Sequence, residues 1–300
     1  MPRPSDGHLP VLAVAGDNLP HAWEQALLAL WDRGISMRTE YDRQDAQGRY
    51  IDPPSLDATM VIEVRQPFGE PRIHKNFPGG PAELEIYRQE VAEGIHDHWA
   101  DPSDPDTWTY TYHQRLFAYA PTTDLKDPQA PRLPPVDQVE RVVRKAAEAA
   151  HSRRIQATTW MPTADPQTDD PPCLQRLWFR LVPDPEGQLH LNLNAHWRSR
   201  DAYKAWFMNA FALTDLQRAI AARIAQRLDR PVGVGSYVDI SDSFHLYGSY
   251  FAEFEPELKK MREQPDYTQR AWPSDHPAVE MMTHETRQKL EADPDFMRAK

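Results

Sequence analysis

Cysteine is nearly absent from this chain, since Cys173 is the only one in 300 residues. A single thiol excludes an intrachain disulfide and a zinc site built from several cysteines, so we expect a protein of the reducing cytoplasm. The chain has only 12 glycines but 29 prolines, which predicts long, stiffened loops. An aromatic content of 10% argues against disorder.

Positive charge and long apolar runs are also scarce. The net charge is −11, which argues against a nucleic-acid partner. No apolar run approaches the ~20 residues that span a bilayer, so we expect no membrane partner. The apolar run near the N-terminus is too short for a secretory signal. The 40% hydrophobic and 26% charged residues are typical of a globular protein.

The spacing of apolar residues predicts a single α+β domain over 1–300, with a mixed sheet flanked by helices. We expect a core over 20–265 and a charged, weakly patterned C-terminal extension over 266–300. Amphipathic patterns predict helices over 20–33, 81–94, 136–150, 201–228 and 250–263. Alternating patterns predict strands over 58–65, 154–160 and 232–247, and a hairpin of 177–182 with 188–197 around the turn PDPEG.

The lone thiol lies in DDPPCLQRLWFRL (169–181), after two prolines and before a strand pattern. A free cysteine is often a small buried hydrophobic residue. It can instead be a nucleophile, provided that nearby cations or dipoles lower its pKa. The two alternatives depend on which cationic side chains reach Cys173.

Arginines gather at two places beside strand patterns. Arg153 and Arg154 begin one predicted strand, and Arg198, with Ser199, follows another just before a helix. Arginine binds phosphate through two N–H groups, and a helix N-terminus favours anions. Either place alone is equally consistent with ordinary surface arginine, so the residues leave both interpretations open.

The segment HDHW raises the question of a metal. His96, Asp97 and His98 could contribute to a two-histidine, one-carboxylate iron site. Adjacent residues on a strand point to opposite faces, so these three would not converge simply. His190 and His196 lie too far apart along one strand to share an ion. A metal oxygenase therefore remains only one of the alternatives.

The order of the short motifs resembles the thymidylate synthase family. SRRI, TTW, PPC, the hairpin, RSRD, Asn209 and HLY (245–247) follow one another over about 100 residues. Upstream, IHDHWAD (95–101), which contains Trp99, resembles the family's tryptophan-containing substrate loop. Tyr110 follows this loop at the spacing found in the family. RT at 38–39 resembles the family's mobile arginine loop.

The resemblance implies the chemistry. Cys173 would add as a thiolate to C6 of a pyrimidine, which turns C5 into a nucleophile toward 5,10-methylenetetrahydrofolate. Tyr110 would help the proton to leave C5. Arg198 would act with the nucleophile and hold the phosphate. A glutamate on the helix at 81–94 would manage protons at the base, and we choose Glu85 among the four on that helix.

The resemblance also implies the binding residues and a homodimer with no resident metal. Asn209 would read the base, because its amide offers both a donor and an acceptor. Arg38, Arg198 and Ser199 would bind the phosphate, and Arg153 and Arg154 would reach it from the partner across a dimer interface formed by the sheet face. His245 and Tyr247 would bind the sugar. His96, Trp99 and Asp201 would contact the folate, and Asp201 would also lie beside the substrate.

Several positions depart from the family pattern. His96 replaces a tryptophan, Leu174 replaces a histidine after the cysteine, and Trp197 replaces a glutamine before RS. KAWFMN (204–209) replaces a loop that contains glycine and proline, and the chain ends in DPDFMRAK in place of a short apolar tail. These changes surround base, sugar and folate, so they concern the choice of substrate.

The divergence resembles the branch that modifies nucleotides for secondary metabolism, such as the UMP C5-methylase of polyoxin-type nucleoside antibiotics. Because hydroxymethylases of deoxycytidylate typically carry an acid at the place of Asn209, we expect C5-methylation of UMP or dUMP. Hydroxymethylation of CMP, dCMP or dUMP stays open because of His96 and the altered tail. A regulator that binds a pyrimidine nucleotide without catalysis is the non-enzymatic alternative.

Overall fold

The computed structural model describes residues 6–101, 104, 107–127, 129–293 and 295–296. Seven strands form one sheet in the order β1-β3-β8-β7-β6-β5, with β2 pairing to β3 at the side of this path. The strands of this sheet are β1 (Val11–Gly16), β2 (Ile35–Met37), β3 (Ser55–Val64), β5 (Gln156–Thr158), β6 (Leu174–Pro183), β7 (Leu189–Asp201) and β8 (Val232–Leu246). The pairs β1–β3 and β7–β8 are parallel and the others antiparallel. The predicted α+β class with a mixed sheet is confirmed.

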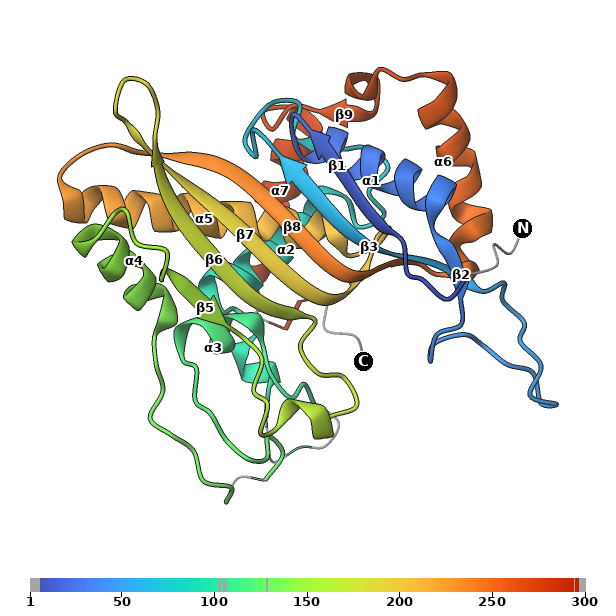
Figure 1. Cartoon of the computed structure of the whole chain (residues 1–300), viewed down its shortest axis with the longest axis horizontal. Helices are drawn as coiled ribbons and strands as arrows, with labels where there is room; N and C mark the ends of the chain where they lie inside the picture. Colours follow the sequence, from blue (N-terminus) through green and yellow to red (C-terminus); the bar gives the residue numbers. More distant parts are fainter. Residues whose placement is uncertain (1–5, 102–103, 105–106, 128, 294, 297–300) are drawn as a thin grey trace.

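The helices lie mainly on one side of this sheet (Figure 1). They are α1 (Leu19–Arg33), α2 (Gly80–Glu93), α3 (Tyr112–Phe117), α4 (Gln138–Glu148), α5 (Trp206–Leu228), α6 (Phe251–Glu263) and α7 (Pro277–Ala292). Helix α5 is buried along most of its length, since Phe207, Leu213, Ile220 and Ile224 all lie in the core. Its apolar stripe packs on β7 and β8, and this contact sets the side on which the core forms.

The opposite face of the sheet carries no helix of the described segments (Figure 1). Along β7 the core side presents Leu191, Leu193 and Ala195, while the alternate side chains, such as His190, Asn192 and Asn194, are partly exposed. A sheet face that is half polar and uncovered is suited to pairing with a second protein surface.

A bulge changes the direction of the side chains at one end of the sheet. Ala58 pairs with Phe244 but Met60 pairs with Ser241, so β8 has one extra residue there. Before the bulge Tyr237 and Ser241 face the core, and after it Phe244 does. Ser243 and His245 are thereby turned away from the core, beside Asp57 of β3.

The segment predicted as a charged extension is in fact part of the fold. The short strand β9 (Ala271–Trp272) pairs with β4 (Ile73–His74), and helix α7 packs on α2. Arg270 and Arg287 each form an ion pair with the body of the protein. The hydrophobic pattern missed α7 because only a few of its side chains, such as Val279 and Leu290, are buried.

The other predicted elements agree with the structure to within a few residues, apart from the start of one helix. The helix predicted from 201 begins at Trp206, because β7 continues through Asp201. The strand β1 was not predicted, although VLAVAG is a short apolar run typical of a parallel strand.

A buried ion pair joins α1 to the C-terminal segment. The Glu24 carboxylate accepts two hydrogen bonds from Arg270, both 2.7 Å, and lies 2.9 Å from Nε2 of His74. We expect Glu24→Gln to lower the free energy of unfolding by about 3–5 kcal/mol, because it leaves a buried guanidinium without its charge partner. Urea denaturation measures this change.

The exposed pair of Asp32 with Arg262 provides the control. We expect Asp32→Asn to cost less than about 1 kcal/mol. Equal destabilisation by the two variants would contradict a special role for Glu24.

Candidate active site

Cys173 lies immediately before β6, where two prolines restrict the backbone. Its carbonyl oxygen accepts a hydrogen bond from the backbone N–H of Arg198, at 2.9 Å. The Arg198 guanidinium donates from Nε to the carbonyl of Pro172 at 3.1 Å and from Nη2 to that of Pro171 at 2.5 Å. The predicted nucleophile and phosphate arginine are therefore joined in one local structure.

The Cys173 thiol is partly buried. Burial raises its pKa, the nearby Asp170 carboxylate raises it further, and Arg198 and Arg200 lower it. The net direction is upward, so the thiol is mainly protonated at neutral pH without a ligand. A reactive thiolate then requires additional positive charge or a proton acceptor.

Two tyrosines lie near the thiol. The hydroxyl of Tyr112 accepts a hydrogen bond from the backbone N–H of Leu174 at 3.2 Å, and its ring meets Trp197 edge-on. Burial raises the pKa of Tyr112 to about 12, with the Cys173 charge as the next cause. Tyr110 is partly buried, and this burial raises its pKa well above the ordinary value. Both phenols stay protonated at neutral pH and can donate hydrogen bonds.

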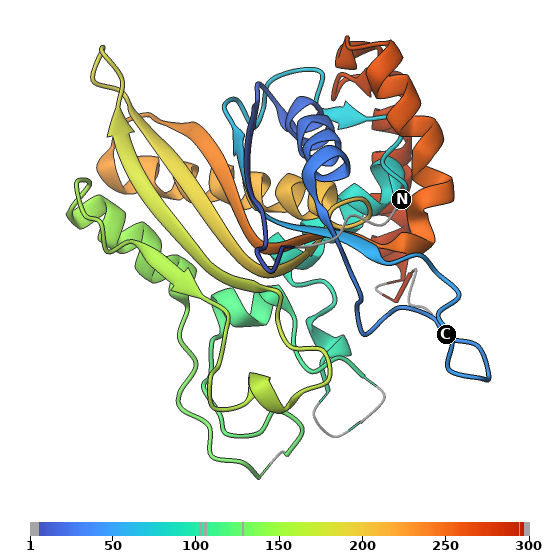
Figure 2. The same ribbon diagram turned by 45° about the vertical axis from the view of Figure 1, so that its right-hand side comes forward.

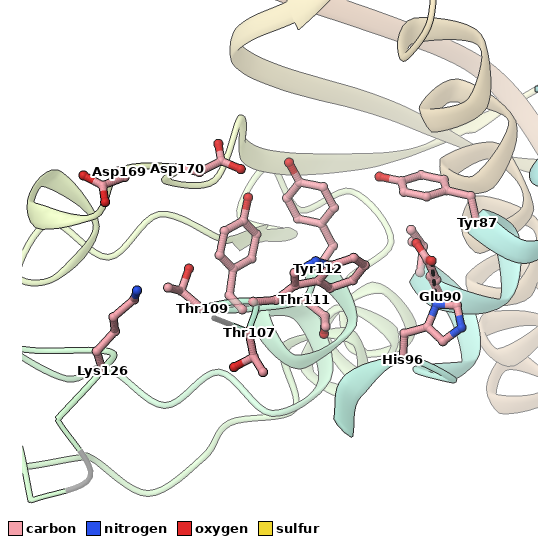
Figure 3. A pocket seen from close by; sticks show the side chains of 13 residues that line it. Tyr87, Glu90, His96, Thr107, Thr109, Thr111, Tyr112, Lys126, Asp169 and Asp170 are labelled. Carbon is pink, nitrogen blue, oxygen red and sulfur yellow. Dashed lines mark hydrogen bonds and ion pairs between the residues drawn. The ribbon is translucent and has the colours of Figure 1, made fainter. Parts of the chain in front are cut away.

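These tyrosines line a cavity of about 420 Å³. Figure 3 shows Tyr87, Glu90 and His96 on one side, Tyr112 in the middle, and Asp169 and Asp170 on the far side. The cavity walls come from α2, from the 107–112 segment and from the loop before β6. It has the size and the mixed aromatic and polar lining of a small-molecule site.

Glu90 faces this cavity, whereas the predicted Glu85 does not. Glu85 is buried on another side of α2, where it accepts hydrogen bonds from Arg88 and Arg287. Burial pushes the pKa of Glu85 up, but these hydrogen bonds lower it to about 2. The choice of Glu85 is therefore corrected, because it is held in ion pairs away from the cavity. Helical periodicity could have indicated Glu90 from the sequence, since Tyr87, Glu90 and Val91 lie on one face of α2.

Glu90 forms a close pair with His96. Its Oε1 lies 2.6 Å from Nδ1 of His96, a side chain that is 1% exposed. The His96 ring stacks on Trp99 with centroids 3.6 Å apart, and Trp99 Nε1 donates to Asp295 at 2.6 Å. The two predicted folate-side residues thus lie together beside the C-terminal segment. The rest of the altered tail, from 297 onward, lies outside the described residues.

The predicted phosphate and sugar residues gather at the bulged ends of β7 and β8. Ser199 pairs with Ser243 and Asp201 with His245. Burial lowers the pKa of His245 and raises that of Asp201, whose Oδ1 accepts from two backbone N–H groups. The Tyr247 ring lies against His245, with centroids 4.6 Å apart.

The loop between β2 and β3 reaches the same region. The ring of Tyr41 meets Tyr247 with centroids 5.9 Å apart. Burial raises the pKa of Tyr41, and Asp170 and Cys173 contribute to the rise. Arg38 donates to Asp42 at 3.0 Å and to the Asp52 carbonyl at 2.8 Å. Arg38 is thus in this loop, bound to it rather than to a ligand.

Asn209 is held by a buried charged network that the sequence did not reveal. Its Oδ1 accepts a short hydrogen bond from Arg200, which donates to Asp239 at 2.5 Å and lies 3.3 Å from the centroid of the Trp197 ring. Because arginine only donates, the amide cannot flip. Nδ2 and one lone pair of Oδ1 remain for a ligand. Arg200 lies nine residues before Asn209, and Asp239 lies thirty-nine residues after Arg200. No local sequence pattern therefore links the three residues.

Arg153 and Arg154 are not brought to Cys173 within one chain. They precede β5, whose Gln156 pairs with Trp178, five residues along β6 from the thiol. That spacing corresponds to roughly 17 Å along a strand. These arginines line a separate surface depression with Lys145 and His151.

Two further observations concern the whole of the described structure. Among its residues no group of three histidine, cysteine or acidic side chains is placed to hold a metal ion. None of its helices combines the length and apolar character that a bilayer crossing needs.

The fold places a free cysteine beside an arginine and close to a cavity of small-molecule size. The family model described as thymidylate synthase matches residues 85–285. The chain therefore belongs to the thymidylate synthase family, and it is a one-carbon transferase that acts on a pyrimidine nucleotide. Members of this family use methylenetetrahydrofolate and are generally dimers.

Similar archaeal proteins carry the name "Putative thymidylate synthase". The protein of Methanocaldococcus jannaschii is 25% identical over 259 residues, covering 83% of this chain and 99% of its own. That of Methanothermobacter marburgensis is 30% identical over 223 residues, covering 74% and 82%. That of Methanosarcina acetivorans is 26% identical over 234 residues, covering 78% and 88%. The low identities agree with a divergent branch.

Proposed function

We propose that this protein methylates C5 of a uridine monophosphate, UMP or dUMP, with 5,10-methylenetetrahydrofolate as the one-carbon donor. The observation that carries the proposal is the joining of Cys173 and Arg198 beside Tyr112, which also lines the cavity that contains the Glu90–His96 pair. This arrangement supplies a nucleophile, a phosphate ligand and proton-transfer groups in one place.

Cys173 starts the reaction as a thiolate. Its sulfur forms a bond to C6 of the base, and the electrons of the C5–C6 double bond move toward C5 and the O4 carbonyl. C5 then takes the one-carbon unit that the folate supplies. The C5 proton is then lost and the bond from the one-carbon unit to the folate nitrogen breaks, which leaves an exocyclic methylene on C5. Tetrahydrofolate would supply a hydride to this methylene and become dihydrofolate, and departure of Cys173 would restore the C5–C6 double bond of the methylated base.

Proton transfer in this scheme belongs to Glu90, His96 and Tyr110. The Glu90–His96 pair can pass a proton between a carboxylate and an imidazole that already lie 2.6 Å apart. The protonated phenol of Tyr110 can order a water that accepts the C5 proton. Trp99 is buried and stacked on His96, so it fixes the orientation of the imidazole that lines the cavity.

The nucleotide is held from both ends. Arg198, Ser199 and Arg38 bind the 5′-phosphate, and His245 and Tyr247 bind the sugar. Asn209 donates from Nδ2 to O4 of uracil and accepts from N3–H on its free lone pair, in the orientation that Arg200 maintains. Asp201 lies at the sugar side, where its raised pKa reflects burial.

A homodimer completes the site. The uncovered face of the sheet forms the interface, and Arg153 and Arg154 of one protomer reach the phosphate in its partner. The spacing along β6 supports this proposal, because these arginines are too far from the thiol of their own chain.

The deciding experiment incubates the protein with UMP, dUMP, CMP and dCMP in turn, with methylenetetrahydrofolate, and weighs the products by mass spectrometry. A product heavier by CH₂ from a uridine nucleotide supports the proposal. Turnover of cytidine nucleotides alone contradicts it.

Hydroxymethylation is the second candidate, and His96 favours it. Its imidazole can position a water where a tryptophan could not, and water capture of the exocyclic methylene leaves CH₂OH on C5. In the same experiment this outcome is a product heavier by CH₂O.

Glu90 and Glu85 provide a matched pair of variants on one helix. We expect Glu90→Gln to lower kcat by about 10²–10³-fold, because the carboxylate of the proton-transfer pair is lost. We expect Glu85→Gln to keep kcat within about threefold and to lower stability by about 1–3 kcal/mol, because Arg88 and Arg287 lose a charged partner. Steady-state kinetics and denaturation of both variants check this, and the reverse pattern would restore Glu85 as the proton-transfer residue.

A further inference from the structure

A row of polar side chains crosses three strands next to the proposed sugar site. Asp57 of β3 lies directly opposite His245 of β8 in an antiparallel pair, and His245 lies opposite Asp201 of β7. Aspartate is disfavoured inside strands, so its place in the middle of this sheet needs a reason. Side chains directly opposite each other are close enough to bind one ligand together.

Two atoms in this row are buried without a partner. Asp57 Oδ2 accepts a hydrogen bond from the Ser243 hydroxyl at 2.8 Å, but its Oδ1 is buried and has no hydrogen-bond partner among the residues that the structure describes. His245 has Nδ1 at 3.4 Å from the same hydroxyl, and its Nε2 is likewise buried and unpaired. Buried polar atoms of native proteins are almost always satisfied, so this juxtaposition points to a ligand.

The charge state of Asp57 makes its carboxylate an acceptor of hydrogen bonds. Burial raises the pKa of Asp57 to about 6, against the lowering effects of the Ser243 hydroxyl and the backbone N–H of Ala58. Asp57 is therefore mostly ionised at neutral pH and can only accept. Burial also lowers the pKa of His245, which keeps the imidazole neutral and able to take either role.

The row lies on the nucleotide side of the fold. Tyr247, two residues after His245, contacts Tyr41, whose pKa responds to Cys173 and Arg198. Asp201, at the other end, follows the Arg198–Ser199 segment on the same strand. The row thus follows the Arg198–Ser199 segment along the sheet and adjoins Tyr247, the residues to which we assign the phosphate and the sugar.

We infer that Asp57 accepts a hydrogen bond from the ribose 2′-hydroxyl, which makes ribonucleoside monophosphates, and UMP in particular, the substrate class. The inference rests on the proposed function and narrows it from UMP or dUMP to UMP. A carboxylate is the group that proteins commonly use for this hydroxyl. Deoxyribose has no donor there, so dUMP leaves the Asp57 oxygen buried and unpaired, which disfavours its binding.

The test compares UMP with dUMP in three proteins: the wild type, Asp57→Asn and Glu63→Gln. Glu63 is on the same strand but far from the row, so it controls for the change of a carboxylate to an amide. We expect the wild type to prefer UMP in kcat/KM by at least about 10-fold. Asp57→Asn should reduce that preference about 10-fold through loss on UMP alone, and Glu63→Gln should leave it unchanged.

Equilibrium binding of the two nucleotides to the wild-type protein gives a readout that needs neither turnover nor a variant. Tighter binding of UMP is expected, and Ser243→Ala, which frees the Asp57 side chain, should weaken the preference if Asp57→Asn fails to fold. Equal or tighter binding of dUMP by the wild type overturns the inference, as does an Asp57→Asn variant that loses activity on both nucleotides equally. Absence of one-carbon transfer to either nucleotide contradicts the proposed function instead, and the binding preference still tests Asp57.

Discussion

Cys173→Ala is expected to lower one-carbon transfer by at least about 10⁴-fold, to below detection. Without the sulfur no bond to C6 forms, and C5 of a pyrimidine is too weak a nucleophile to attack by itself. Release of tritium from a C5-labelled nucleotide measures the loss, because that step follows the addition of the thiolate.

The same variant should still bind the nucleotide. The thiol is a small part of the contact surface, and Arg198, Ser199 and His245 remain in place. Nucleotide affinity within about threefold of the wild type is therefore the control for folding. Residual turnover near the wild-type rate would show that the covalent mechanism is wrong.

Mixing two inactive variants is expected to restore activity. We propose that each site combines Cys173 of one chain with Arg153 and Arg154 of the other. The homodimer of Cys173→Ala lacks the nucleophile, and that of Arg153→Ala with Arg154→Ala lacks phosphate ligands. After subunit exchange, half of the dimers would be mixed, and each would contain one intact site. Activity should therefore rise to about one quarter of the wild-type value.

The control for this experiment is the same two variants mixed without subunit exchange, which should stay inactive. Exchange itself is followed by tagging one variant. If the mixed dimers form and stay inactive, the arginines do not act across an interface.

The local motifs of the site could be predicted because they follow one another in the sequence. Cys173 with its two prolines, and Arg198 with Ser199, are short segments of two neighbouring strands, and a hairpin fixes their register. Once the hairpin is recognised, Cys173 and Arg198 must lie side by side. The α+β class followed in the same way from alternating and helical patterns.

The residues that the sequence did not reveal depend on tertiary contacts. Glu85 and Glu90 lie on different faces of α2. Helix α7 packs on the face that carries Glu85, and its Arg287 forms an ion pair with that carboxylate. Arg200 is next to a surface-like motif, yet it is 2% exposed because it forms an ion pair with the buried Asp239. The pattern of α7 was weak because only Val279, Thr286 and Leu290 of this helix are buried.

The bonds between Arg198 and the carbonyls of Pro171 and Pro172 impose a sequence of events. The same guanidinium cannot keep both carbonyl bonds and also grip a phosphate with its full set of donors. A nucleotide phosphate that takes over these two donors would therefore loosen the diproline turn that carries the thiol. In that case we expect the nucleotide to enter ahead of the folate, and the sulfur to be less accessible to electrophiles while Arg198 holds the turn.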